Sequence, residues 1–245
     1  MINDNIIQVV EILERTAQGV TQPFLCRGDN DALYYAKGRS AGRKSLVAEW
    51  LASSLAHEFG IPLAEFAVGE VDEALIDYGA PEVIDLGAGY VFLSKRVDSV
   101  MELTWPNVAE IPLTIQTDIL MFDYWVRNQD RILTPLGGNP NLLWQPDTRS
   151  VVAIDHNQAF DLEFDPDEFF TSHVFAGTWD AVFADMFERQ HYEDRFWRAM
   201  ARFDSICDKM PDSWWYLDDD LPLGFDQAAA RTILTECVPN FWSRR

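Results

Sequence analysis

Apolar residues change their spacing along the first part of the chain in a way that predicts strands around one helix. The apolar run 6–13 carries charges only near its end, and the runs 24–27 and 33–37 flank the turn-forming residues 28–31. These runs predict a strand and then a β-hairpin. From 43 to 59 an apolar residue recurs at every fourth position, which is typical of an amphipathic helix. The apolar positions of this helix are Val47, Leu51, Leu55 and Phe59.

Two more apolar runs complete the strand-rich part. Gly60 ends the helix, after which 63–71 is typical of a strand. The acidic and glycine-containing residues 72–88 predict a loop. The short run 90–93 predicts a buried strand.

The chain becomes helical and aromatic beyond this last strand, so we divide it into 1–96 and 97–245. Apolar residues on one face predict a helix over 113–127. The apolar runs 141–144 and 151–154 flank a turn and predict a small hairpin. The remaining residues have mostly helical spacing, and the sequence therefore predicts an α+β protein.

Composition and charge narrow the functional classes. With 245 residues, 48% apolar and 24% charged, the chain has the composition of a packed globular protein of one domain or one domain of two lobes. Nineteen basic and forty acidic residues give a formal charge of -21. This charge disfavours direct binding to nucleic acid or to an anionic membrane.

The cysteines and the N-terminus indicate the compartment. Three cysteines without a CxxC pair provide neither a disulfide framework nor a zinc knuckle. The sequence shows no signal peptide and no apolar stretch of about 18 residues. We therefore expect a cytoplasmic protein.

An ordered set of polar residues suggests a chemistry. A loop at Gly19 precedes Lys37 at the end of a strand, Glu49 on the next helix, Asp130 after the second helix and Asp155 after the hairpin. Transfer of a γ-phosphate requires a lysine and a loop at the phosphates, metal ligands, and a carboxylate near the acceptor hydroxyl. Each of these parts has a candidate in this order.

The chain resembles the HipA-like kinases. Within this family it is similar to the compact branch, which lacks the extra N-terminal module of the HipA toxin. The resemblance covers about residues 8–165. It is carried by GVTQP at 19–23, AKG at 36–38, NQDR at 128–131, NPNLLW at 139–144 and AIDHNQAF at 153–160. It implies a bilobal protein-kinase-like fold, with an antiparallel sheet and one helix in the N-lobe (1–96) and a mainly helical C-lobe (97–245).

The same resemblance implies a nucleotide site for ATP in the N-lobe. Lys37 would contact the α- and β-phosphates, and Glu49 would orient it. The hinge that contacts adenine would comprise Phe92, Ser94 and Lys95.

The loop 19–23 would cover the nucleotide in this resemblance. Gly19 and Thr21 are its candidate cofactor-binding residues, although a single glycine is fewer than phosphate-cradling loops usually have. Thr21 or Thr16 would be candidate sites of autophosphorylation.

Acceptor and metal chemistry would belong to the C-lobe. Asp130 would accept or orient the proton of the acceptor hydroxyl. Asn128 and Arg131 would support the same catalytic loop, and Arg131 could also neutralise a phosphate. Asp155 would bind Mg²⁺, in the place of the aspartate of the kinase DFG motif.

The second metal ligand is ambiguous. The kinase pattern is D-x-x-x-x-N, whereas here Asn139 lies nine residues after Asp130. The intervening residues 132–138 therefore contain an insertion of about four residues ahead of Asn139 and Asn141. Asn139 stands just before Pro140, as is usual in the family, and is the preferred ligand. Asn141 remains the alternative.

The function that this resemblance implies is a serine/threonine protein kinase that uses ATP and Mg²⁺. Its partner would be a protein substrate or a cognate regulatory protein. A small-molecule kinase and a nucleotide-binding pseudokinase remain alternatives. The acidic residues 161–167 lack the glycine and the terminal glutamate of a calcium loop, and the four histidines lack the spacing of a zinc site.

Overall fold

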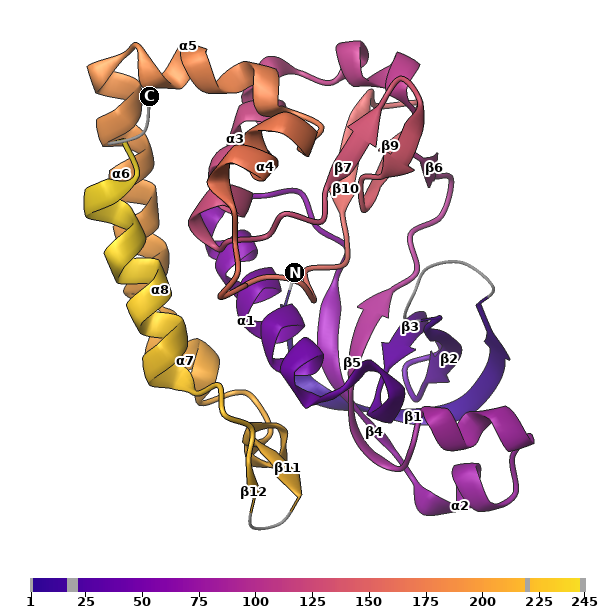
Figure 1. The fold of residues 1–245 in the computed structure, drawn as a ribbon. Coiled ribbons are helices and arrows are strands. Elements are labelled where there is room, and N and C mark those ends of the chain that lie inside the picture. Colours follow the sequence, from indigo (N-terminus) through magenta and orange to yellow (C-terminus); the bar gives the residue numbers. More distant parts are fainter. Residues whose placement is uncertain (1, 17–21, 219–220, 243–245) are drawn as a thin grey trace.

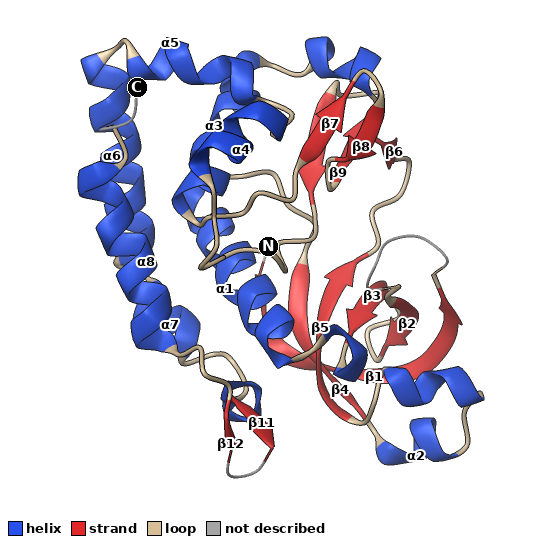
Figure 2. Cartoon of the chain, viewed as in Figure 1, coloured by secondary structure: helices blue, strands red, loops and turns tan. Residues whose placement is uncertain are grey.

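The computed structural model describes residues 2–16, 22–218 and 221–242, and it is a mixed α/β structure. Figure 2 shows a strand-rich part, a second group of short strands, and helices gathered on the opposite flank. The strands are β1 (Ile2–Arg15), β2 (Phe24–Gly28), β3 (Leu33–Lys37), β4 (Phe66–Val71), β5 (Gly89–Lys95), β6 (Met101–Glu102), β7 (Ile132–Thr134), β8 (Gly137–Asn139), β9 (Leu142–Gln145), β10 (Ser150–Ala153), β11 (Tyr216–Asp218) and β12 (Leu221–Pro222).

The helices are concentrated in the second half of the chain. The α-helices are α1 (Arg43–Phe59), α2 (Glu73–Asp77), α3 (Leu113–Trp125), α4 (Pro166–Ser172), α5 (Trp179–Phe183), α6 (Met186–Met200), α7 (Phe203–Cys207) and α8 (Gln227–Asn240). Short 3-10 helices are η1 (Arg39–Ala41), η2 (Pro81–Asp85), η3 (Trp105–Glu110), η4 (Ala176–Thr178) and η5 (Asp212–Trp215). No described helix is both long and apolar enough to cross a lipid bilayer.

The first five strands close into a barrel of order β1-β2-β3-β5-β4. Four of its five strand pairs are antiparallel, as expected for this sheet, but closure into a barrel was not predicted. The closing pair, β1 with β4, is parallel, with Ile7 opposite Gly69 and Val9 opposite Val71. Strand β1 changes register twice against β2. Such bulges increase strand curvature, so one long strand can pair with both neighbours and close the sheet.

Apolar side chains fill the barrel. They belong to one buried cluster that includes Ile7, Phe24, Cys26, Tyr34, Ala36, Ala67, Val91 and Leu93. The segment 72–88, predicted to be a loop, contains α2 and η2. Asp72 caps α2 by accepting from the Ala74 amide (2.8 Å), and Val83 of η2 is buried in the same cluster. The loop prediction was wrong because these two short helices are stabilised by a cap and by contact with the barrel rather than by helical periodicity.

Helix α1 has the predicted bounds but is buried almost all around, not on one face. It lies between the barrel and the flank formed by α6, α7 and α8 (Figure 1). Trp50 donates its indole N–H to the Ile206 carbonyl of α7 (3.0 Å), and Arg195 of α6 donates to the Phe59 carbonyl (2.7 Å). The helix ends at Gly60, whose φ of 93° favours glycine.

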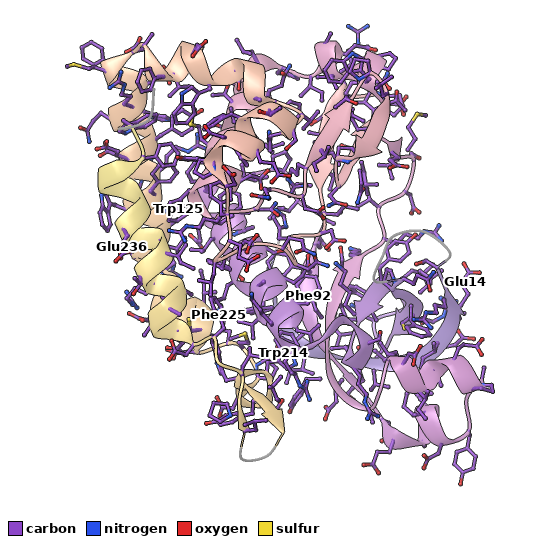
Figure 3. The ribbon with its side chains drawn as sticks, viewed as in Figure 1. Glu14, Phe92, Trp125, Trp214, Phe225 and Glu236 are labelled. Carbon is purple, nitrogen blue, oxygen red and sulfur yellow. The ribbon has the colours of Figure 1, made fainter. Side chains whose placement is uncertain are left out.

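The rest of the chain packs around α3, which was predicted over 113–127 and ends at Trp125. Trp125 donates its indole N–H to the Leu234 carbonyl of α8 (3.1 Å), and Figure 3 labels it between these helices. The predicted hairpin is present as β9 and β10, with Val151 opposite Trp144. Strand β6 extends it to three strands. The boundary predicted near residue 96 falls where the chain leaves the barrel after β5, and the division into two lobes stays a prediction.

The insertion between Asp130 and Asn139 is not an irregular loop. It forms the antiparallel pair β7 and β8, in which Ile132 lies opposite Asn139. Ile132 also bridges to His173. The base of this hairpin is therefore fixed to the helical part of the structure.

Candidate active site

Three charged side chains from distant parts of the sequence form one ion-pair cluster. The ammonium of Lys37 lies 2.8 Å from Oε2 of Glu49 and 2.5 Å from Oδ1 of Asp155. The Lys37 and Glu49 side chains are 9% and 3% exposed, whereas the Asp155 side chain is 25% exposed. The cluster is therefore open to solvent mainly at Asp155.

The backbone fixes each member of this cluster. Lys37 ends β3, and a Cβ on the following Gly38 would collide with the Leu86 carbonyl. Glu49 lies on the buried helix α1. Asp155 follows β10 with a left-handed φ of 55°. A non-glycine residue adopts this conformation at an energetic cost, and such residues cluster at functional sites.

Opposite charges control protonation in this cluster. Burial disfavours the charged form of Lys37 and by itself would lower its pKa. The carboxylates of Glu49 and Asp155 together have the larger effect and raise the pKa of Lys37. Burial also disfavours the charged form of Asp155 and by itself would raise its pKa. The charge and the hydrogen bond of Lys37 oppose this effect, and the pKa of Asp155 is lowered. Near neutral pH, Lys37 is therefore a cation suited to a phosphate, and Asp155 is an anion suited to a divalent cation.

Asp130 lies close enough to this cluster to feel the charges of Asp155 and Lys37. The amide of Asn141 donates to Oδ2 of Asp130 at 2.9 Å. Burial raises the pKa of Asp130, and the hydrogen bond from Asn141 opposes this shift. A carboxylate whose pKa is raised accepts a proton more readily, as a general base requires.

The two candidate metal ligands lie in different surroundings. Asn141 is buried beside Asp130. Asn139 is exposed at the end of β8, opposite Ile132. The geometry therefore favours Asn141, although the sequence favoured Asn139, and metal binding by either residue stays a prediction.

A buried carboxylate that the sequence interpretation missed organises the loop that carries Asp130. Asp123 of α3 accepts hydrogen bonds from Nε of Arg131 (2.7 Å) and from the Asn128 amide (2.8 Å), and its Oδ2 lies 3.1 Å from Nε2 of His173. Arg131 is 1% exposed and Asn128 is fully buried. Both residues therefore support the loop in this structure, and a direct catalytic role for either stays a prediction.

A signal for Asp123 was present in the sequence. It is the only charged residue in the run Met121-Phe122-Asp123-Tyr124-Trp125, and a carboxylate in such a run is seldom buried without a partner. Burial disfavours its charge, but the charge of Arg131 and the hydrogen bond from His173 together outweigh burial and lower the pKa of Asp123.

His156 is a second residue that the interpretation left without a role. Its backbone amide donates to Oε1 of Glu49 (3.0 Å), its Nδ1 lies 3.3 Å from Oγ of Ser53, and its Nε2 lies 2.7 Å from Nη2 of Arg131. Burial, reinforced by the charge of Arg131, lowers the pKa of His156 to about 3. The ring is therefore neutral near neutral pH.

The predicted adenine hinge lies on β5. Phe92 is opposite Lys37 in the barrel, and its ring is buried against Phe66 at a centroid distance of 5.8 Å. Ser94 lies one residue beyond Leu93, and Lys95 pairs with Glu65 (2.7 Å). Nucleotide contacts by these residues stay predictions.

The predicted covering loop 19–23 lies only partly within the described residues. Gly19 and Thr21 lie outside the described residues. Thr16 is described, and its amide donates to the Pro23 carbonyl (2.9 Å). The roles of these three residues stay predictions.

The oxygen-bearing side chains around Asp155 suit Mg²⁺ better than a metal ion that is bound by protein side chains alone. Within the described residues, no group of three or more His, Cys, Asp or Glu side chains could hold a metal ion. Magnesium instead prefers one or two carboxylates together with phosphate oxygens and water. Asp155 supplies a carboxylate, and the buried Oδ1 of Asn157 has no hydrogen-bond partner in the described part of the chain. This oxygen and the amide oxygen of Asn141 are suitable additional donors.

Comparison with solved structures identifies a kinase with a similar fold. The proinflammatory kinase CtkA of Helicobacter pylori aligns with 98% of this chain and 97% of its own, at 11% identity and a TM-score of 0.52. A chain of the CtTel1 dimer aligns with 95% of this chain and 12% of its own, at 13% identity and a TM-score of 0.31, which is too low to support an argument. A search of curated proteins finds no match.

Comparison with protein families extends the resemblance beyond its predicted end near residue 165. A family model described as HipA-like kinase matches residues 9–245. This match includes the ion-pair cluster, the loop around Asp130 and the C-terminal helices. The chain belongs to the HipA-like kinase family.

Proposed function

We propose that this protein is an ATP- and Mg²⁺-dependent kinase that transfers the γ-phosphate to a serine or threonine hydroxyl of a protein. Family membership supports a kinase-type phosphotransferase. One observation supports the proposed phosphate transfer from ATP to a hydroxyl. The ion-pair cluster of Lys37, Glu49 and Asp155 lies beside the hydrogen-bonded pair of Asp130 and Asn141. Phosphoryl transfer depends mainly on positioning and on charge neutralisation, and these residues provide both.

The nucleotide would lie between two lobes in this proposal. The barrel and α1 would form the N-lobe, and residues 97–245 the C-lobe. Lys37, held by Glu49, would bind phosphate oxygens of ATP. Mg²⁺, when bound, would neutralise charge on the phosphates, with Asp155, Asn141 and Asn157 as its protein ligands.

Asp130 would act on the acceptor. Its carboxylate would accept a hydrogen bond from the attacking hydroxyl and orient it, and would take the proton as the oxygen–phosphorus bond forms. Asn141 would hold this carboxylate in place through its amide nitrogen. A protein acceptor is proposed because the family resemblance points to serine/threonine kinases. A basic segment would suit a chain of formal charge -21.

The proposal can be tested by incubating the purified protein with γ-labelled ATP and Mg²⁺, alone and with cell lysate. We expect a labelled protein on a gel, and a phosphate adduct by intact mass if the kinase labels itself. Asp130→Ala and Asp155→Ala should both abolish the label, whereas only Asp130→Ala should leave ATP binding intact. Asp147→Asn, in the exposed turn between β9 and β10, is the matched control and should label normally.

Two results would contradict the proposal. Thermal stabilisation by ATP without any labelled protein would favour a small-molecule kinase or a pseudokinase. No ATP binding would reject the assignment of the site itself.

A further inference from the structure

His156 joins helix α1 to the loop that carries Asp130. Its ring is 1% exposed and lies between Ser53 of α1, at 3.3 Å from Nδ1, and Arg131, at 2.7 Å from Nε2. The position of the ring therefore affects both elements.

The partners of the ring determine its tautomer. An arginine guanidinium has only donors, so Nε2 of His156 must accept the hydrogen bond from Arg131. A neutral imidazole then carries its proton on Nδ1 and donates it to Oγ of Ser53. Both ring nitrogens are satisfied in only this arrangement, which gives the link a defined direction from Arg131 through the ring to Ser53.

On the loop side, Arg131 fixes the residues that surround the acceptor site. One of its Nη1 hydrogen bonds goes to the Asn141 carbonyl (2.6 Å) and another to the Ile154 carbonyl (3.2 Å). Asn141 in turn bonds the Asp130 carboxylate. A shift of Arg131 would therefore move Asp130 and the backbone that precedes Asp155.

On the helix side, Ser53 lies one turn after Glu49. Residues four apart share a face of a helix, so the link to Ser53 and the pair with Lys37 are on the same face of α1. The backbone amide of His156 also bonds Glu49. A displacement of α1 would therefore disturb the lysine cluster and the His156 ring together.

We propose that His156 is a positioning residue that couples α1 to the catalytic loop, because its ring joins Ser53 to Arg131. The proposal rests on the proposed kinase function. His156 does not touch the reacting atoms. It keeps Lys37, which would hold the phosphates, in register with Asp130, which would hold the acceptor. A misplacement of about 1 Å between such groups can lower a rate by about a hundredfold.

The link can be cut on the helix side with one pair of serine variants. Ser53→Ala removes the partner of Nδ1, whereas Ser54→Ala removes a fully buried hydroxyl that has no hydrogen-bond partner among the described residues. We expect Ser53→Ala to lower kcat by about tenfold or more, with the KM for ATP changed by less than about twofold. Ser54→Ala should retain the wild-type kcat. Equal kcat values for the two variants would overturn the proposal.

Replacement of the histidine separates its two hydrogen bonds. The amide of His156→Gln can reach the position of Nε2 and accept from Arg131, but it does not supply the bond to Ser53. This variant should match Ser53→Ala, and the double variant should lose no more kcat than either single one, because both changes cut the same bond. Losses that multiply in the double variant would show that the residues act separately and would also overturn the proposal.

A measurement independent of catalysis distinguishes failure of the link from failure of the kinase assignment. ¹⁵N NMR of labelled histidine should show a neutral ring protonated at Nδ1, assigned by its loss in His156→Gln. A ring protonated at Nε2 would reject the link whatever the activity. A wild-type protein that has the expected tautomer but no phosphotransfer activity would reject the proposed function, and with it the coupling role.

Discussion

The amide of Asn141 donates a hydrogen bond to the Asp130 carboxylate at 2.9 Å, although a complete β-hairpin separates the two residues. The insertion is absorbed as the paired strands β7 and β8, which return the chain close to its starting point. Asn141 has a left-handed φ of 50°, which turns it out of the extended chain. The insertion therefore lengthens the sequence between the two residues without separating them in space.

This pairing predicts different effects of the two asparagines. Asn141→Ala should lower kcat by about a hundredfold and raise the Mg²⁺ concentration needed for half-maximal rate, because it removes both the support of Asp130 and an oxygen donor. Asn139→Ala, at the exposed end of β8, should remain within about twofold of wild type. A Mg²⁺ titration of the kinase rate checks both, and a larger loss in Asn139→Ala would reverse the assignment.

The sequence could predict residues that belong to local motifs, but not their distant partners. Lys37, Asp130 and Asp155 were found because each stands at a recognisable place in a motif. The pair between Lys37 and Asp155 joins residues 118 positions apart, and no local pattern indicates it. Asp123 and His156 were missed for the same reason, because the value of a buried polar residue depends on partners that only the fold provides.

For the fold, too, the sequence could predict local elements but not how they pack together. Periodicity gave the bounds of α1, because the apolar positions are regular and Gly60 ends the helix. It did not show that α1 is buried on all sides, since its smaller residues, such as Ala52 and Ser54, are neutral in a helical pattern. Closure of the barrel depends on bulges in β1, which follow from strand pairing rather than from the sequence of one strand.

Removal of the Asp123 carboxylate should strongly destabilise the protein. Asp123→Ala leaves the Arg131 guanidinium buried without its counter-charge, and breaking such a pair costs about 3 to 5 kcal/mol. The free energy of unfolding in urea measures this loss. Asp204→Asn is a suitable control, because its pair with Arg231 is exposed to solvent and should contribute about 1 kcal/mol or less. Equal losses of unfolding free energy in the two variants would show that the hydrogen-bonded network around Asp123 stabilises the protein no more than the control ion pair does.

The C-terminal segment should stabilise the arrangement of α1. Trp214 of η5 is fully buried, η5 packs against α1, and the indole donates to the Tyr90 carbonyl of β5 at 3.3 Å (Figure 3). Trp214→Ala should therefore lower the free energy of unfolding by about 3 to 5 kcal/mol. Trp105→Ala, at a position 42% exposed, should change it by less than about 1 kcal/mol. Urea unfolding of the two variants compares a buried with an exposed tryptophan. Similar losses of unfolding free energy would contradict the stabilisation of α1 by its packing against η5.

His156 should make the protein sensitive to acid. Its pKa is about 3 in the folded protein, because burial disfavours the charged ring, whereas an exposed histidine in the unfolded chain has a pKa near about 6.5. Below this higher value the unfolded chain binds a proton that the folded protein does not. The free energy of unfolding should therefore fall with decreasing pH, with a contribution from this residue of up to about 1.4 kcal/mol per pH unit.

The comparison of variants isolates this contribution from that of the carboxylates. Asp123 and Asp155, whose pKa values are lowered in the folded protein, lose their stabilising effect mainly below the ordinary range for Asp, outside the interval in which an unfolded histidine gains its proton. His156→Gln should therefore show a shallower slope of unfolding free energy against pH between about 6 and 4, by about one proton. Ser54→Ala, which removes a buried hydroxyl but no ionisable group, should keep the wild-type slope. Denaturant unfolding at several pH values measures these slopes, and equal slopes for wild type and His156→Gln would contradict a neutral, buried ring.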